Sequence, residues 1–251
     1  MIRRRLQMVA LAALPIFAVA CGGGTEATAP RAAQPPPSPP ASAPTIRPAD
    51  FIAKVDNPWF PLTPGTTLTY KGVKDGKPTV DKVVVTDRTT VVDGVPSVAL
   101  RDNLYEGGNL EERTTDWYAQ DRQGNVWYFG EETAELDPKG HVTSTEGSWQ
   151  AGKDGAQPGI FMPAHPTVGQ TGRQEYLNGH AEDHFQILRF DAAVQVPAVS
   201  SDKALLTKEW TPIEPSVIDH KYYVRGIGTV LEQSVTGPKE TNALVSVTRG
   251  R

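Results

Sequence analysis

Cysteine is almost absent from this chain: Cys21 is the single cysteine among 251 residues. After Cys21 no thiol follows, so a disulfide framework, a cysteine metal site and a cysteine nucleophile are all excluded. The folded part must therefore be held together by its core alone. About 200 residues follow the N-terminal region, enough for one domain that buries most of its unfolded surface.

The chain also lacks an excess of basic residues. It has 25 Lys and Arg against 29 Asp and Glu. Three of the arginines, Arg3, Arg4 and Arg5, lie in the first 20 residues, so without them Lys and Arg fall to 22 and the net charge is -7. An acidic body without a basic run is a poor ligand for polyanions. Nucleic acid is therefore excluded as a partner.

No apolar run is long enough to span a bilayer as a helix. The longest follows Arg5, from Leu6 to Ala20, and it contains Pro15. A positive segment followed by a short apolar run with small residues at its end is typical of an export signal. Residues 1–20 are therefore predicted to be a signal peptide.

The end of this run resembles the lipobox of bacterial lipoproteins. It reads Phe-Ala-Val-Ala-Cys over residues 17–21, with Ala18 where leucine is most common. The resemblance implies that Cys21 carries fatty-acyl chains such as palmitate and becomes the first residue of the mature protein. We therefore expect export, with the lipid bilayer as a partner and anchoring to the bacterial cell membrane or outer membrane.

Residues 21–49 lack side chains that could form a core. Three glycines are followed by Ala, Ser, Thr and many prolines. Such a composition favours an extended, partly polyproline II chain. We interpret residues 21–49 as a tether between Cys21 and one domain at residues 50–251, which we expect to be a monomer.

Long helical periodicity is missing from residues 50–251, and β signals replace it. Turn pairs such as Asp75-Gly76, Asp93-Gly94 and Asn178-Gly179 separate runs rich in Val, Thr, Tyr and Trp. This rhythm predicts a mainly β fold, a single antiparallel meander forming a strongly curved sheet, half-barrel or barrel. A β-sandwich is the alternative.

Alternation assigns faces to several of these strands. Phe185 and Ile187 alternate with His184 and Gln186, which predicts one buried and one wet face. By the same rule, Lys221 is predicted on a wet face. His220 alternates with Ile218 and Tyr222, and is predicted to be a histidine of the core or of a cavity wall.

Two segments of residues 50–251 have distinctive sequences, one near the start of the folded part and one near its end. Residues 57–65 read Asn-Pro-Trp-Phe-Pro-Leu-Thr-Pro-Gly, and residues 222–228 read Tyr-Tyr-Val-Arg-Gly-Ile-Gly. Prolines forbid a helix in the first phrase, so it is predicted to be an irregular packed arm. Both phrases resemble an uncharacterised family of exported bacterial proteins, many of them lipoproteins. No established activity comes with this resemblance.

Large apolar side chains mark two candidate ligand-binding stretches. Residues 146–172 are rich in Gly and Pro, which predicts a long loop, yet they contain Trp149, Phe161 and Met162. Such a loop is too apolar to remain in water and is expected to pack onto the sheet or across its mouth. An aromatic hairpin contains Trp117 and Trp127. Two interpretations of its rings remain: they pack across the strands, or they line a pocket.

Metal and catalytic signals are weak. His180, Glu182 and His184 would share one face of a strand, but the outer two would stand about 13 Å apart, too far for one zinc. No Gly-x-Ser-x-Gly elbow is present. We therefore predict no metal, no cofactor and no catalytic residue.

Two classes of function remain. We favour a membrane-tethered binding module for a hydrophobic or amphipathic small molecule, or for an envelope protein. The alternative is a hydrolase or another enzyme that uses acids and histidines on the polar face of the sheet.

Overall fold

Antiparallel strands make up almost all of the part of the chain that this computed structural model describes, residues 44–250. The signal peptide, Cys21 and most of the tether predicted above lie outside these residues. The elements are η1 Pro48–Asp50, β1 Phe51–Ile52, β2 Thr67–Lys74, β3 Lys77–Val92, β4 Val95–Glu106, β5 Asn109–Asp121, β6 Val126–Leu136, β7 Val142–Ser144, β8 Trp149–Gln150, β9 Gln157–Met162, β10 Thr171–Arg173, β11 Glu175–Tyr176, β12 His184–Val196, β13 Val199–Trp210, β14 Ile218–Val224, β15 Gly228–Thr236 and β16 Thr241–Thr248.

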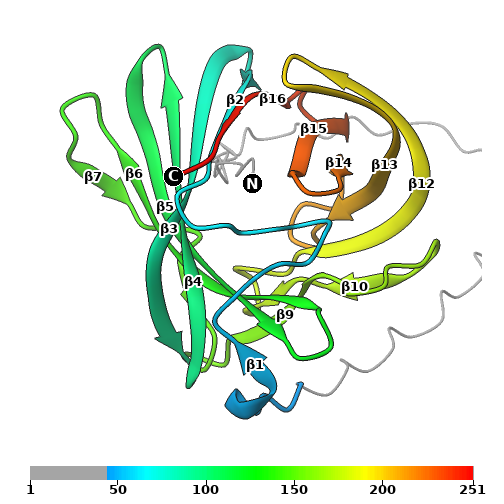
Figure 1. The fold of residues 1–251 in the computed structure, drawn as a ribbon. Coiled ribbons are helices and arrows are strands. Elements are labelled where there is room, and N and C mark those ends of the chain that lie inside the picture. Colours follow the sequence, from blue (N-terminus) through cyan, green and yellow to red (C-terminus); the bar gives the residue numbers. More distant parts are fainter. Residues whose placement is uncertain (1–43, 251) are drawn as a thin grey trace, which may run out of the picture. The chain divides into compact units, whose positions relative to one another are not determined.

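The strands form one strongly curved sheet (Figure 1). Its order is β10-β12-β13-β14-β15-β16-β2-β3-β4-β5-β6-β9-β11, and β1, β7 and β8 pair at its sides with β5 or β6. From β2 to β6, and again from β12 to β16, each strand pairs with the next in the chain. The predicted antiparallel meander is therefore confirmed, as a curved sheet and not as a sandwich.

The two ends of the sheet meet in one short segment. Residues 171–173 pair with β12 as β10, and residues 175–176 pair with β9 as β11. Gly159 of β9 lies so close to the backbone of Arg173 and Gln174 that a side chain would not fit there. The sheet is thus nearly closed into a barrel, with a seam at this segment.

Two of the tight turns follow from their sequence. Asp75 and Gly76 have φ of 52° and 75°, and Asp93 and Gly94 have φ of 49° and 76°. Two successive residues with positive φ form the turn whose twist matches that of a hairpin, and Asp-Gly is among the pairs that adopt it at low cost. These two pairs connect β2 to β3 and β3 to β4, as the sequence predicts.

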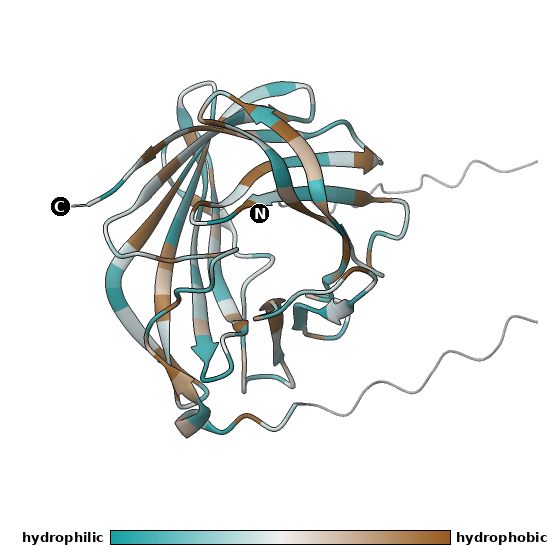
Figure 2. Ribbon diagram, turned by 45° about the vertical axis from the view of Figure 1, so that its right-hand side comes forward, coloured by the Kyte–Doolittle hydropathy of each residue, from teal (hydrophilic) through white to brown (hydrophobic). Residues whose placement is uncertain are grey.

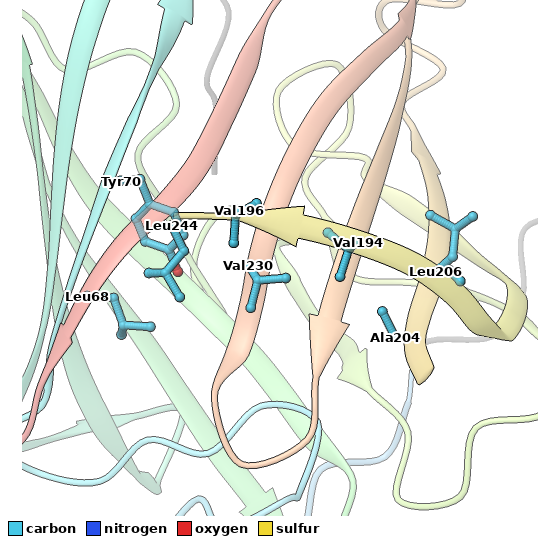
Figure 3. Packing of buried hydrophobic residues seen from close by; sticks show 9 residues of the cluster. Leu68, Tyr70, Val194, Val196, Ala204, Leu206, Val230 and Leu244 are labelled. Carbon is cyan, nitrogen blue, oxygen red and sulfur yellow. The ribbon is translucent and has the colours of Figure 1, made fainter. Parts of the chain in front are cut away.

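The tip of the β12–β13 hairpin reaches β16. The Ala198 N–H donates to the Leu244 carbonyl at 3.2 Å. Figure 3 shows Val194 and Val196 on β12 crossing β15 toward Leu244 and Tyr70. Apolar side chains from this hairpin and from three other strands, β2, β15 and β16, gather here: Leu68, Tyr70, Ala192, Val194, Val196, Ala204, Leu206, Val230 and Leu244. The hairpin is therefore held by an apolar cluster in addition to its ladder.

Residues 146–172 are more regular than the loop expected from their glycines and prolines. They contain β8 and β9, both of which pair with β6, and the start of β10. Trp149, Phe161 and Met162 are buried, with exposed fractions of 4%, 4% and 1%. These side chains therefore belong to the wall of the sheet and not to a flap over it.

Candidate functional site

An arm between β1 and β2 crosses one end of the curved sheet (Figure 1). At its start the Asn57 N–H donates to Gln120 Oε1 of β5 at 2.8 Å. The next residue, Pro58, accepts from the Gly226 N–H in the β14–β15 turn at 2.8 Å. At its far end the Gly65 N–H donates to the Val85 carbonyl of β3, also at 2.8 Å. The predicted packed arm thus joins opposite walls of the sheet.

Register partners define an inner face of the sheet. Directly opposed residues of antiparallel neighbours lie on the same side. One row of partners runs Val85, Leu100, Asp116, Glu131 and Trp149, through β3, β4, β5, β6 and β8. We call the side that carries this row the inner face, because the arm packs against it.

Aromatic rings cover the inner face where the arm packs. Phe60 of the arm lies 5.2 Å from Tyr118 and 4.6 Å from Phe161, measured between ring centroids. Tyr118 stacks on Tyr128 at 4.8 Å, and Tyr128 meets the edge of Trp149 at 5.3 Å. We call these five side chains the aromatic cluster. Because both apolar bodies and phenol groups are present, the cluster offers an apolar surface with polar tips.

Two buried carboxylates lie next to the aromatic cluster on the inner face. The Tyr128 hydroxyl donates to Asp116 Oδ1 at 2.6 Å, and Asp116 is the register partner of Glu131. Thr133 Oγ1 lies 3.4 Å from Glu131 Oε2 and 3.0 Å from Thr114 Oγ1. Asp116 and Glu131 are each 5% exposed. Two carboxylates thus oppose each other in a buried, hydroxyl-rich setting.

A second polar group occupies the inner face of β13, β14 and β15. Lys221 Nζ lies 2.6 Å from Glu209 Oε2 and 3.6 Å from Glu232 Oε1, and all three side chains are buried. Hydroxyls of Thr207 and Tyr223 each lie 3.0 Å from Glu209 Oε1. Burial alone lowers the pKa of Lys221, but the two carboxylates outweigh it and raise the pKa well above its usual value. The prediction that Lys221 is on a wet face was therefore wrong.

Tyr70 lies between these two polar groups. Its hydroxyl donates to the Thr229 carbonyl at 2.9 Å. Burial, followed by the charges of Asp81, Asp102 and Glu232, raises its pKa well above the usual value. Between the two polar groups the inner face is mainly apolar, because Tyr70 lies there beside Leu68 and Leu244. Hydrophilic and hydrophobic residues alternate along the strands in Figure 2.

The structure divides the five predicted ligand-binding residues into two groups. Trp149, Phe161 and Met162 belong to β8 and β9 beside the inner face. Trp117 and Trp127 alternate with Tyr118 and Tyr128 and lie on the outer face. Trp127 Nε1 donates to Asp121 Oδ2 at 2.9 Å, and Phe51 of β1 packs against its ring. The aromatic hairpin therefore packs across its strands on both faces.

A pocket of about 310 Å³ lies on the outer side near the start of the domain. Its lining includes Arg47, Phe51, Arg122, Trp127 and Ile160. Trp127, one of the predicted ligand-binding residues, thus lines this pocket. This pocket is separate from the aromatic cluster.

The histidines do not converge. His180 and Glu182 lie in the turn before β12, and His184 begins that strand, where it stacks on Trp210 at 5.6 Å. His220 lies on the outer face opposite Lys208; burial, and then the charge of Lys208, lower its pKa. The prediction of a core or cavity-wall histidine was therefore wrong. Within residues 44–250, no group of three or more His, Cys, Asp or Glu could hold a metal ion.

Alternation could have revealed the opposed carboxylates. Glu112 and Asp116 on β5 share parity with Thr114, and Glu131 and Glu135 on β6 share parity with Thr133. One face of these two paired strands thus carries acids and threonines at alternate positions. A solvent-exposed face would instead carry charges of both signs. This pattern is easily overlooked in the sequence, because polar positions of a strand are ordinarily expected to face water.

Comparisons with known proteins yield weak structural likenesses. No family model matches the chain, and no curated protein matches it. One similar structure is that of a Bacteroides fragilis protein described as exported with a YmcC-like fold, with a TM-score of 0.45 and 15% identity over 76% of this chain and 99% of that one. Another, of a Parabacteroides distasonis protein described as a lipoprotein, has a TM-score of 0.39 and 10% identity over 76% of this chain and 98% of that one. Neither description names a ligand or an activity.

In the part of the chain that the structure covers, residues 44–250, no helix has the length and apolar character needed to cross a membrane.

Proposed function

We propose that this protein is an exported lipoprotein, anchored through Cys21, whose curved sheet binds an amphipathic small molecule. The observation that carries the proposal is the inner face. There the aromatic cluster and buried carboxylates adjoin, joined by the hydrogen bond from Tyr128 to Asp116. An amphipathic molecule needs this combination of an apolar surface and polar groups that fix its orientation.

The size of the sheet supports the same proposal. Its path contains 13 strands. Side chains just fill a barrel of about eight strands, and the interior widens as strands are added. The arm occupies one end of this wider interior, so a ligand enters from the other end.

A neutral dye tests the binding proposal. The mature protein is placed in phosphatidylcholine nanodiscs and titrated with prodan, whose fluorescence rises in apolar surroundings, and the signal of empty nanodiscs is subtracted. We expect saturable binding that Tyr118→Leu weakens about three- to tenfold, because the ring stack is lost while apolar volume is kept. Trp117→Leu, the neighbouring change on the outer face, serves as the control and leaves binding unchanged.

Two results would contradict this proposal. One is the lack of saturable binding by the wild-type protein. The other is a loss of binding in Trp117→Leu but not in Tyr118→Leu, which would place the ligand on the outer face. Melting curves of both variants show whether a loss of binding follows from unfolding.

The anchor is tested separately. Mass spectrometry of the mature wild-type chain should find acyl chains on Cys21, because the preceding residues resemble a lipobox. Cys21→Ser should remain as an uncleaved precursor. An unmodified Cys21 at the mature N-terminus would overturn the lipoprotein proposal and leave the binding proposal intact.

A further inference from the structure

Four basic side chains share the outer face of β2 to β5. Alternation from the inner-face residues of the same strands places Lys71, Lys82, Arg101 and Arg113 on the opposite side of the sheet. All four side chains are exposed to solvent. We call these four residues the basic patch.

Strand register makes the basic patch continuous. Lys82 on β3 is a diagonal neighbour of Lys71 on β2 and of Arg101 on β4. Arg101 is in turn a diagonal neighbour of Arg113 on β5. Diagonal positions of a sheet lie about 7–8 Å apart, within reach of long side chains. One anionic surface can therefore contact all four residues together.

The charge of the basic patch is not balanced by ion pairs. None of its four side chains forms a salt bridge within residues 44–250. The acids that border the patch by register are Glu111, at the bulge of β5, and Glu132 of β6, opposite Thr115. The whole chain has more acids than bases, 29 against 25. A local excess of positive charge on an acidic protein favours an anionic partner at this face.

Apolar side chains lie at one end of the basic patch. Val73, which is 38% exposed, follows Lys71 on the same face of β2. Tyr105 lies on the same face of β4, and Lys82 Nζ is 5.3 Å from the centroid of its ring. Tyrosine and lysine, which combine an apolar body with a polar tip, are typical of the interface between membrane and water. The patch therefore fits the headgroup region of a bilayer better than a soluble acidic partner.

The chain before the domain is long enough for this face to reach a bilayer. Residues 22–43 separate the proposed acylation site, Cys21, from the described residues, and a chain of this length spans at most about 75 Å. A domain of about 200 residues has a radius of gyration of about 16 Å. The length of the tether therefore does not select which face of the domain meets the lipid, and the charge of each face does.

We propose that the basic patch docks the domain onto an anionic bilayer, through contacts of its four side chains with lipid phosphates. The proposal uses the Cys21 anchor of the proposed function and is independent of the ligand. Each basic residue near an anionic bilayer strengthens the attraction about fivefold. Four residues are too few to hold a free protein firmly, but the tether raises the effective concentration of lipid at the patch. Docking by the outer face leaves the inner face accessible.

Acetylation of lysines measures the docking. The mature protein is placed in nanodiscs of phosphatidylcholine, or of phosphatidylcholine and phosphatidylglycerol in equal parts, and treated with the uncharged reagent N-acetoxysuccinimide. Mass spectrometry gives the acetylation rate of each lysine. We expect the rates of Lys71 and Lys82 to fall about two- to fivefold in the anionic nanodiscs, and to recover in high salt, which screens the attraction. Lys203, an exposed residue of β13, should react at the same rate in both.

Arginine variants locate the effect without changing the two lysines that report it. Arg101→Gln combined with Arg113→Gln should abolish the protection of these lysines, because the attraction falls about 25-fold. Lys139→Gln combined with Lys153→Gln, at two exposed positions outside the patch, removes the same charge and should keep the protection. The melting temperatures of both double variants should equal that of the wild type, because substitutions of exposed residues change stability little.

Two results would overturn the docking proposal and leave the binding of prodan unaffected. One is equal acetylation of the reporting lysines in neutral and anionic nanodiscs; if polyglutamate added to neutral nanodiscs then protects them, the patch binds an acidic protein instead. The other is protection that persists in the double arginine variant. An unmodified Cys21, which the same mass spectra would reveal, would overturn the anchor and the docking proposal together.

Discussion

Two stretches of the inner face contain buried charges in opposite arrangements. On β13–β15, Lys221 lies between Glu209 and Glu232 at 2.6 and 3.6 Å. On β5 and β6, Asp116 and Glu131 oppose each other as register partners. The first stretch pairs its charges across neighbouring strands, and the second places charges of one sign side by side.

The difference separates charge that serves the fold from charge that serves a ligand. A buried lysine lies between two carboxylates, and two hydroxyls donate to the other oxygen of Glu209, so the group is well hydrogen-bonded and fixes the register of three strands. Opposed carboxylates repel each other, so their close pairing is a local departure from stability. Such departures are expected at functional sites, so the part of the inner face that carries Asp116 and Glu131 is where we expect function.

Removal of Lys221 should have the largest effect. Lys221→Met leaves Glu209 and Glu232 buried together without the cation, and the free energy of unfolding should fall by about 3–5 kcal/mol. Urea denaturation followed by circular dichroism measures this. Lys71→Met, on the exposed outer face of β2, is the control and should change stability by less than about 0.5 kcal/mol. A similarly small loss in Lys221→Met would show that this stretch is not a structural ion cluster.

Alkaline pH should destabilise the protein through this stretch and the neighbouring Tyr70 of β2. The pKa values of Lys221, Tyr70 and Tyr223 are raised in the folded protein, that of Tyr223 mainly by burial and then by Glu209. Each group keeps its proton when folded but loses it when unfolded above about pH 10. The stability that each contributes is therefore complete below that pH and declines above it, by about 1.4 kcal/mol per pH unit for each group.

Urea denaturation at increasing pH, with Lys221→Met beside the wild type, measures the decline. The variant should lose stability less steeply, because one of the three groups is gone. Equal slopes would show that Lys221 does not titrate with a raised pKa.

Local sequence signals were sufficient for the antiparallel meander but not for its closure. Asp75-Gly76 and Asp93-Gly94 predict hairpin turns because their backbone conformations favour these residues. Phe185 and Ile187 predict a buried face by alternation, and both are buried. The closure of the sheet through residues 171–176 was not predictable, because it depends on pairings between strands far apart in the sequence.

The site was predicted only in part, because alternation assigns residues to a face and does not show which face is buried. Trp149 and Phe161 were identified by their size, and the structure places them beside the inner face. Lys221 was assigned to water because it is charged, although partners on two other strands bury it. Glu131 alternates with Thr133 and Glu135, but its importance follows only from the pairing of β5 with β6.

The smallest expected effects come from one substitution, Glu to Gln, made on each of the two stretches and compared by the free energy of unfolding. Glu232→Gln should lower the free energy of unfolding by about 1–2 kcal/mol, because Lys221 loses one of two carboxylates but keeps Glu209 at 2.6 Å. Glu131→Gln should change it by less, at most about 0.5 kcal/mol, because repulsion from Asp116 is removed and the amide oxygen still accepts from Thr133. Both are measured by urea denaturation without added ligand, and the difference between the two variants is the essential result. If Glu131→Gln destabilised the protein as much as Glu232→Gln does, Glu131 would be part of a structural ion cluster, and the distinction between the two stretches would be lost.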